Sequence, residues 1–318
     1  MRNRLFRFLT TVLVVYSFSI AALAQTKAFD TSRMDRSADA CDDFFQFANG
    51  TWVKNTEIPP SQSRWGSFNI LSEGNRDVSH EILESAAKDT KATGDRKLIG
   101  DFYASCMDEA AIEKAGAHPL DDEFAGIEKI KTVDDLKHEI ASLHKQGYPV
   151  VFRLGGGPDQ KNSNTVILNA GQGGLSLPNK DYYTSDSDSM KATRAKFVEH
   201  MTNMFKLLGE TSDQAAADAA TVMSVQMRLA NASMAPEQLR NRDKNYNKIP
   251  LAEAQKIVPD FPLDEYLKER GITARTDIDF QQPTFFAEVD KMLTDVPLDQ
   301  WKTYLRWMVL SSAAPALS

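Results

Sequence analysis

Apolar residues recur at steps of three and four along most of the chain beyond residue 42, which predicts a mainly α-helical protein. The segment Ser67–Lys88 carries such steps and is expected to form one long helix. Asp95–Lys114 is expected to form another, because its apolar residues gather on one face. Gly116 would end that helix, since glycine accepts the left-handed backbone found at helix termini.

The helical pattern continues towards the C-terminus. Thr132 is expected to begin a helix, because its hydroxyl can accept from free main-chain amides while Asp135 reaches back, and Gly147 would end that helix. Further helices are expected at 198–208, 284–293 and 298–313. The last of these is apolar on most sides between Trp301 and Leu310, so we expect it to need a covering partner. Left exposed, it would make the isolated chain poorly soluble.

One part of the chain has a β pattern. Pro149–Leu154 and Asn164–Asn169 are rich in β-branched residues and bounded by turn residues, which predicts a small β-hairpin. The glycines at 155–157 lie between the two runs and are expected to belong to the connecting loop. A phosphate-binding role for them is disfavoured, because no helix follows and Pro158-Asp159 favours a turn.

The N-terminus has the pattern of a secretory signal peptide. Arg2, Arg4 and Arg7 precede an apolar run that ends in Ala22-Leu23-Ala24, a small-residue cleavage pattern. Residues 1–24 are therefore expected to direct export to the periplasm or the extracellular space, with cleavage after Ala24. The alternative is a retained N-terminal membrane anchor, although the apolar core is short for a bilayer of about 30 Å. Residues 25–39 are polar and small and are expected to be a flexible lead-in.

The charge balance limits the classes of partner. The 318-residue chain has a net charge of −7, and without residues 1–24 the count becomes 34 basic against 44 acidic residues. No basic cluster stands out, which argues against binding to nucleic acid and to anionic membrane surfaces. Its length is sufficient for one large domain or two smaller ones.

The five histidines do not have a metal-binding spacing. Two zinc ligands on one helical face stand four residues apart, because four residues advance a helix by about 400°. His138 and His144 are separated by six residues, which places their imidazoles about 120° apart around a helix. We therefore expect two solvent-facing histidines on a surface helix. The others are His80, His118 and His200.

The segment from Cys41 to Leu71 is the most distinctive in the chain. Phenylalanines and Trp52 crowd a short helical turn, which Asn49-Gly50 is expected to end. Pro59-Pro60 then forces an extended passage. After it, the cation Arg64 stands between a serine and a tryptophan.

Several blocks of this sequence resemble the neprilysin family of zinc metallopeptidases. The blocks are Cys41-Asp-Asp-Phe-Phe, Asn49-Gly-Thr-Trp, Ile58-Pro-Pro, Ser63-Arg-Trp-Gly-Ser-Phe, Phe102-Tyr-Ala-Ser-Cys-Met-Asp and Leu175-Ser-Leu-Pro-Asn-Lys-Asp-Tyr-Tyr. Their order and spacing fit, and the resemblance runs from about Asp39 to the C-terminus. It implies that residues 40–318 form the multi-helix N-terminal region of such a peptidase, which roofs a catalytic chamber and limits access to short peptides.

The zinc-binding motifs of that family are missing from this sequence. The family places His-Glu-x-x-His, a downstream glutamate ligand and an Asn-Ala-x-Tyr strand in its C-terminal half, and this sequence contains no His-Glu-x-x-His. The resemblance therefore implies the first half of an exported zinc metalloendopeptidase, inactive by itself, whose partners are short peptides and the missing catalytic half. The alternative is a free-standing exported helical module that binds peptides or another subunit without catalysis.

The resemblance also implies roles for Arg64 and the two cysteines. In the family, the arginine at the position of Arg64 binds the free C-terminal carboxylate of a peptide, for which a planar guanidinium is well suited. The alternative is an ion pair or an aromatic stack that holds the loop. Cys41 and Cys106 could form a disulfide with each other, whereas in the family both bridge to the C-terminal half. Carboxylates in the same blocks are expected to cap helices or lie on their surface: Asp42, Asp43, Asp101 and Asp108.

Overall fold

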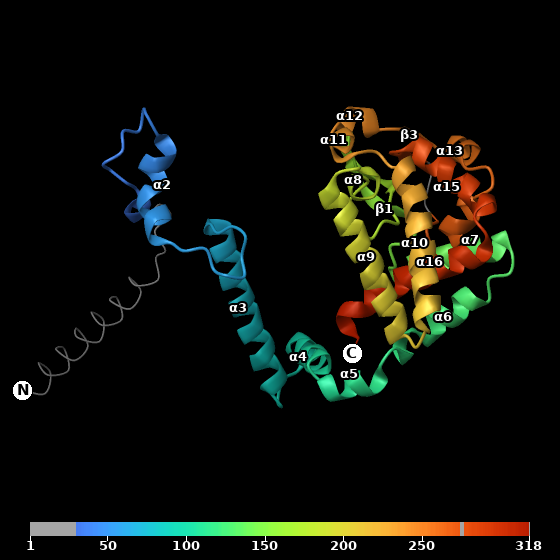
Figure 1. The fold of residues 1–318 in the computed structure, drawn as a ribbon, viewed down its shortest axis with the longest axis horizontal. Coiled ribbons are helices and arrows are strands. Elements are labelled where there is room, and N and C mark those ends of the chain that lie inside the picture. Colours follow the sequence, from blue (N-terminus) through green and yellow to red (C-terminus); the bar gives the residue numbers. More distant parts are fainter. Residues whose placement is uncertain (1–29, 274–276, 318) are drawn as a thin grey trace, which may run out of the picture. The chain divides into compact units, whose positions relative to one another are not determined.

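The computed structural model describes residues 30–273 and 277–317, which divide into two compact units, Met1–Tyr103 and Ala104–Ser318 (Figure 1). We call these unit 1 and unit 2 and describe each separately. The predicted signal peptide, residues 1–24, lies outside the described residues. Among the residues that are described, no helix is long and apolar enough to cross a membrane.

Unit 1 contains helices connected by short loops. They are η1 (Thr31–Arg33), α2 (Phe44–Asn55), α3 (Ser67–Lys88) and α4 (Gly94–Cys106), the last of which extends just beyond the unit. The predicted bounds of α3 are confirmed. The expectation that Asn49-Gly50 ends a short turn is wrong, because α2 continues through both residues. Gly50 is buried, and a Cβ there would lie 2.3 Å from Nε2 of Gln46, so this glycine allows close packing inside a helix.

The helix expected at Asp95–Lys114 is two helices. The helix α4 ends at Cys106, and after a short turn a new helix begins, α5 (Glu109–Ala115). The carboxylate of Asp108 accepts a hydrogen bond from the main-chain N–H of Ala111 and so caps the new helix. Gly116 ends it with a φ of 53°, as predicted.

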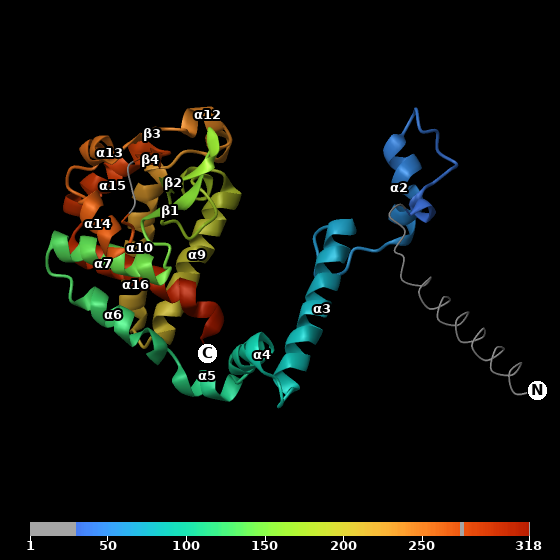
Figure 2. The same ribbon diagram turned by 180° about the vertical axis from the view of Figure 1, so that it is seen from behind.

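Unit 2 is a helical body around a small sheet (Figures 1 and 2). Its helices are η2 (His118–Leu120), α6 (Asp121–Glu128), α7 (Val133–Gln146), α8 (Asp181–Thr184), α9 (Asp188–Leu207), α10 (Ser212–Ala232), α11 (Pro236–Leu239), α12 (Arg242–Asn245), α13 (Leu251–Ile257), α14 (Leu263–Glu269), α15 (Pro283–Asp295), α16 (Leu298–Ala313) and η3 (Ala314–Ala316). The predicted capping box of Thr132 and Asp135 is present at the start of α7, and Gly147 ends that helix with a φ of 96°.

The predicted hairpin is present and is longer than expected. Strand β1 (Phe152–Asp159) pairs antiparallel with β2 (Asn162–Gln172), so the glycines at 155–157 lie inside the strand and not in its loop. The ladder to Ile167, Leu168 and Asn169 holds them there despite the low strand propensity of glycine. Two short strands were not predicted, β3 (Lys248–Pro250) and β4 (Asp277–Phe280), and they complete a sheet of order β1-β2-β4-β3.

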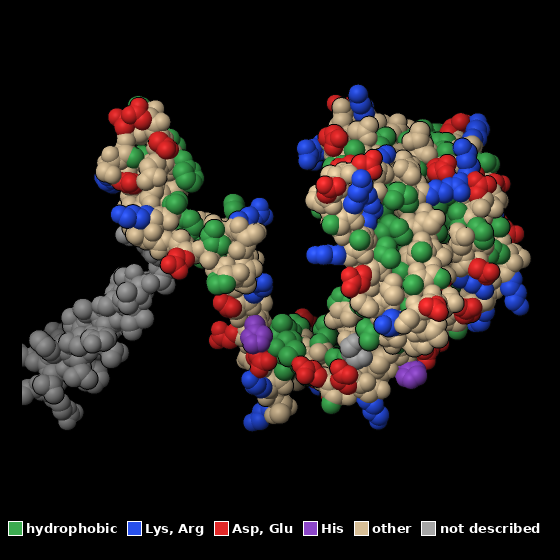
Figure 3. Space-filling model, in the orientation of Figure 1, with side chains coloured by type: hydrophobic (Ala, Val, Ile, Leu, Met, Phe, Trp, Pro, Cys, Tyr) green, Lys and Arg blue, Asp and Glu red, His purple; other side chains and the backbone are tan. Residues whose placement is uncertain are grey.

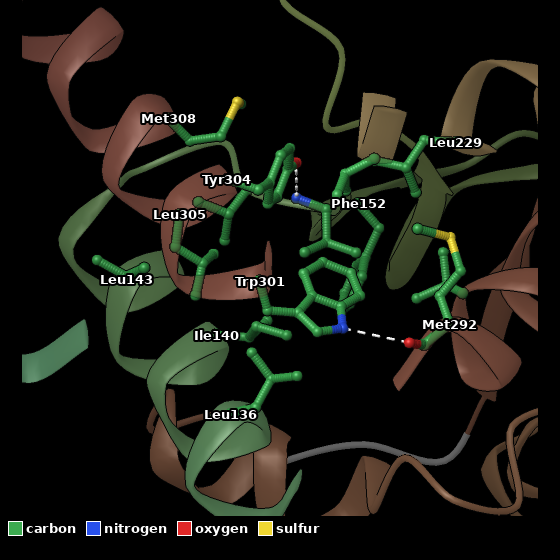
Figure 4. Packing of buried hydrophobic residues seen from close by; sticks show 14 of the residues in the cluster. Leu136, Ile140, Leu143, Phe152, Leu229, Met292, Trp301, Tyr304, Leu305 and Met308 are labelled. Atoms are coloured by element: carbon green, nitrogen blue, oxygen red, sulfur yellow. Dashed lines mark hydrogen bonds between the residues drawn. The ribbon is translucent and has the colours of Figure 1, made fainter. Parts of the chain in front are cut away.

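The helix α16 lies in the hydrophobic core of unit 2 (Figure 4). Trp301, Tyr304, Leu305 and Trp307 are buried, and Nε1 of Trp301 donates to the main-chain oxygen of Met292 on α15. The expectation that this helix needs an outside partner is therefore wrong, because unit 2 itself covers it. The observed fold is mainly α-helical, as predicted, with one small sheet.

Candidate functional site

Arg64 lies in the loop between α2 and α3 and is exposed. Its guanidinium forms no hydrogen bond or ion pair with the described residues. A different arginine holds this region together: Arg33 donates to the hydroxyl of Ser67 at 2.7 Å and lies over the ring of Trp52, 5.8 Å from its centroid. The donors of Arg64 are thus available to a ligand, and its role in binding a carboxylate stays a prediction.

Exposed apolar side chains concentrate on α2, α3 and α4 of unit 1 (Figure 3). Phe68 is 88% exposed, and others gather on the same helices: Phe44, Phe45, Leu71, Val78, Ile82, Leu98, Ile99 and Phe102. We call this set the unit 1 apolar surface. Exposed apolar side chains that gather in patches commonly mark binding interfaces.

The two cysteines remain separate thiols in the structure. Cys41 precedes α2, Cys106 ends α4, and both are free and exposed. Each is therefore accessible to a partner thiol, and the two predicted pairings stay open. Of the four carboxylates in the family blocks, Asp43 and Asp108 cap helices as expected.

The expectation that both histidines of α7 face solvent is correct for His138 and wrong for His144. His138 is exposed and pairs with Glu269 of α14. His144 is largely buried: its Nε2 donates to the main-chain oxygen of Val150 at 2.7 Å, and its Nδ1 accepts from the hydroxyl of Tyr266 at 2.7 Å. Burial lowers the pKa of His144 to about 4, so its imidazole is neutral at pH 7.

The residues that the structure describes do not form a zinc site. No three histidine, cysteine, aspartate or glutamate side chains among 30–273 and 277–317 lie close enough together to hold a metal ion. The described residues therefore do not fit the zinc that the family resemblance implies.

The last of the family blocks, residues 175–183, is fixed by buried hydrogen bonds. The hydroxyl of Tyr183 accepts from the main-chain N–H groups of Ser176 and Leu177 and donates to Oε1 of Gln226 at 2.7 Å. The Ser176 hydroxyl in turn accepts from the side chains of Gln226 on α10 and Trp307 on α16. Burial raises the pKa of Tyr183 to about 12, so it remains a donor. This block therefore ties its loop to two core helices.

A hollow of about 220 Å³ lies beside this loop and was not predicted from the sequence. It is lined by Pro149, Arg153, the segments 172–175 and 177–179, Ser233 and Leu239, and we call it the Arg153 hollow. Among these lining residues Arg153 alone is charged. No motif or spacing reveals this site, because its residues come from four separate stretches of the chain.

Comparison with known proteins matches both units to one protein family. A family model described as Peptidase family M13 matches residues 40–318. Neprilysin-3 of Drosophila melanogaster is 29% identical over 306 residues, covering 90% of this chain and 39% of that protein. Endothelin-converting enzyme 1 of Mus musculus is 30% identical over 237 residues, covering 71% of this chain and 30% of that protein.

A solved structure matches the fold closely. The Mycobacterium tuberculosis zinc metalloprotease Zmp1, in complex with an inhibitor, superposes with a TM-score of 0.81 at 28% identity, over 91% of this chain and 44% of Zmp1. The fold and sequence blocks thus define the N-terminal region of a neprilysin-like zinc metallopeptidase. The chain belongs to Peptidase family M13. It spans less than half the length of these relatives.

Proposed function

We propose that this chain is the N-terminal, chamber-forming portion of an exported zinc metalloendopeptidase that hydrolyses short peptides, and that the chain alone is inactive. Membership of Peptidase family M13 supports the peptidase assignment. The lack of a metal-binding cluster among the described residues supports inactivity without a second portion. The zinc, its ligands and the general base would all be supplied by a catalytic portion that carries His-Glu-x-x-His.

The unit 1 apolar surface is the observation that supports this proposal best. Phe68, Leu71 and Leu98 are each at least 60% exposed, although burying such a side chain is worth about 1.5–3 kcal/mol. Unit 2 buries most of its large apolar residues, with Met107, Val166 and Leu207 as exposed exceptions, so the exposure is concentrated on α2, α3 and α4. In this proposal the catalytic portion covers the surface, and the two portions together enclose the peptide.

Binding between the two portions tests the proposal. The chain is co-expressed with a C-terminal portion of a family member that contains His-Glu-x-x-His, and the complex is isolated and assayed on short peptides with and without a zinc chelator. We expect a stable complex with chelator-sensitive activity. Phe68→Glu should weaken the complex about ten-fold or more, because a charge replaces an apolar contact. Leu207→Glu, at a similarly exposed residue of α9, is the matched control and should have no effect.

Two results would contradict this proposal. Chelator-sensitive hydrolysis by the purified chain alone would show that it carries its own catalytic site. Equal binding by the Phe68→Glu and Leu207→Glu variants would show that the unit 1 apolar surface is not the interface.

We further propose that Arg64 binds the C-terminal carboxylate of the peptide in the complete enzyme. Its exposed guanidinium without a described partner supports this role. In the reconstituted complex, Arg64→Gln should raise KM about ten-fold or more for peptides with a free C-terminus, since a hydrogen bond to a charged group contributes about 1.5–3 kcal/mol. Peptides amidated at the C-terminus should be hardly affected. An equal effect on both kinds of peptide would point instead to a structural role.

The same proposal places the protein outside the cytoplasm, in the periplasm or the extracellular space. The pattern of Arg2, Arg4 and Arg7 followed by an apolar run and Ala22-Leu23-Ala24 supports cleavage after Ala24. N-terminal sequencing of the exported protein should begin at Gln25. A start at Met1 in a membrane fraction would favour the retained anchor.

A further inference from the structure

Beside the Arg153 hollow, the backbone at Gly174 is held against the segment before β1. Two backbone segments approach each other there, and the hydroxyl of Tyr304 joins them by accepting from the main-chain N–H of Val151 at 2.9 Å and donating to the main-chain oxygen of Gly174 at 3.0 Å. Val151 has a φ of 53°, an unusual value for a β-branched residue. A Cβ at Gly174 would lie 2.6 Å from the main-chain oxygen of Val151, so only glycine permits this approach.

Most polar groups that line the hollow are already paired within the protein. The side-chain amide of Gln172 donates to the main-chain oxygen of Met234 and accepts from its N–H. The hydroxyl of Ser233 donates to the main-chain oxygen of Leu229, and Oδ1 of Asn179 accepts from the N–H of Asp181. These side chains shape the walls and leave few groups to bind a polar ligand.

Arg153 differs from the other polar residues of the lining. Its Nε donates to the main-chain oxygen of Gln172 at 3.0 Å, which fixes the orientation of the guanidinium. Its two Nη groups form no hydrogen bond with the described part of the chain. A guanidinium held through Nε can still present both Nη groups to the two oxygens of one carboxylate.

The charge and size of the hollow select its ligand. A single arginine with no acidic residue in the lining attracts an anion, although the chain as a whole carries a net charge of −7. The rest of the lining includes aliphatic side chains: Pro149, Leu175, Leu177, Pro178 and Leu239. At about 220 Å³ the hollow is smaller than the 300–1,000 Å³ or so of pockets for drug-sized ligands, which limits it to about one amino-acid residue.

We propose that the Arg153 hollow binds an aliphatic amino-acid residue that carries a free carboxylate. The side chain packs among Leu175, Leu177 and Leu239, and the carboxylate accepts hydrogen bonds from the Nη groups of Arg153. Two sources share this chemistry, the C-terminal residue of a peptide and a free N-acyl amino acid. This binding site is separate from Arg64 and does not depend on zinc or on a catalytic portion.

Calorimetric titration of the purified chain tests the proposal. The probes are N-acetyl-leucine, its uncharged analogue N-acetyl-leucinamide and a pentapeptide with C-terminal leucine. We expect N-acetyl-leucine to bind about ten-fold or more tightly than the amide, because the amide lacks the charge that pairs with Arg153. Tighter binding of the pentapeptide than of N-acetyl-leucine would identify a peptide C-terminus as the source, and equal binding would identify the single residue.

Three variants assign the binding to this hollow. Arg153→Gln should weaken binding of N-acetyl-leucine about ten-fold or more, to the level of the amide. Arg242→Gln, an exposed arginine of α12 outside the lining, is the matched control and should bind normally. Arg64→Gln should also bind normally. Circular dichroism and thermal unfolding of each variant verify that it is folded.

The proposal is overturned by any of three results. These are equal binding of the acid and the amide, loss of binding in Arg64→Gln with retention in Arg153→Gln, and no binding of N-acetyl-leucine or the pentapeptide at millimolar concentrations. None of these results bears on the interface between the chain and a catalytic portion, so the two proposals can fail independently.

Discussion

His144 illustrates how tertiary contacts change the properties of a single residue. Its place in the last turn of α7 gives no sign of burial, yet α14 and the segment before β1 enclose it. The main-chain oxygen of Val150 can only accept, so the proton of the neutral imidazole lies on Nε2 and Tyr266 donates to Nδ1. Arg270 extends the network by donating to the hydroxyl of Tyr266 at 3.1 Å.

The lowered pKa of His144 predicts a pH-dependent stability. The unfolded imidazole takes up a proton near pH 6.5, whereas the folded one does so only near pH 4. The folded state is therefore fully favoured above pH 6.5, and this contribution is lost as the pH falls towards 4. The full loss is about 3 kcal/mol in the free energy of unfolding. Urea unfolding between pH 7.5 and 4.5 measures most of this loss.

The contribution of His144 can be separated from that of other groups by two variants. His144→Asn should have a smaller fall in stability over this range than the wild type, because it has no imidazole to protonate. His138→Gln, which alters the exposed histidine of the same helix, should keep the full fall. A wild-type curve that matches that of His144→Asn would contradict the assigned pKa.

At the scale of elements, the sequence predicted those helices whose ends carry their own capping residues. Thr132, Asp135 and Gly147 bound α7 through local contacts, and such contacts can be recognised without the fold. Predictions failed where distant contacts decide the structure. Gly50 stays helical because it packs against Asp35 and Gln46, and the glycines of β1 stay extended because β2 pairs with them.

The candidate sites also differ in whether local sequence or distant contacts define them. Arg64 could be selected from the sequence, because it lies in a continuous block that resembles a known family. Arg153 could not, since its surroundings come from segments that only the fold brings together. The apolar run of α16 was recognised, but its partner was misjudged, because hydrophobicity reports that a helix is covered and not which part of the chain covers it.

The loop at 175–183 offers a test of how one hydroxyl fixes an element. Tyr183→Phe removes a buried group that accepts two main-chain N–H groups and donates to Gln226, and leaves those partners unpaired. We expect a loss of about 2–4 kcal/mol in the free energy of unfolding, since each buried unpaired group costs about 1–3 kcal/mol. Chemical denaturation measures this loss.

The adjacent tyrosine provides the control. The hydroxyl of Tyr182 makes no hydrogen bond with the described residues, so Tyr182→Phe should change the stability by less than about 0.5 kcal/mol. A loss in Tyr183→Phe as small as that in Tyr182→Phe would mean that the ring packing, which both variants keep, and not the hydroxyl, fixes the loop.

At the scale of the whole molecule, the two units differ in how they are stabilised. Apart from Ala86, the buried hydrophobic residues of the described chain lie in unit 2, between Leu120 and Leu310. Unit 1 has long, well-formed helices without a comparable core of its own. Unit 2 therefore buries most of its own apolar side chains, whereas unit 1 leaves many of its apolar side chains exposed.

This difference bears on the order in which the protein matures. Unit 1 is synthesised first, yet it would be the last to reach its final environment if a C-terminal catalytic portion covers α2, α3 and α4. During that interval Phe68 and its neighbours resemble the surface of a folding intermediate, which chaperones recognise and which aggregates when unprotected. If the proposed export and the proposed catalytic portion both hold, unit 1 would depend on a holding chaperone in its compartment until that portion covers α2, α3 and α4.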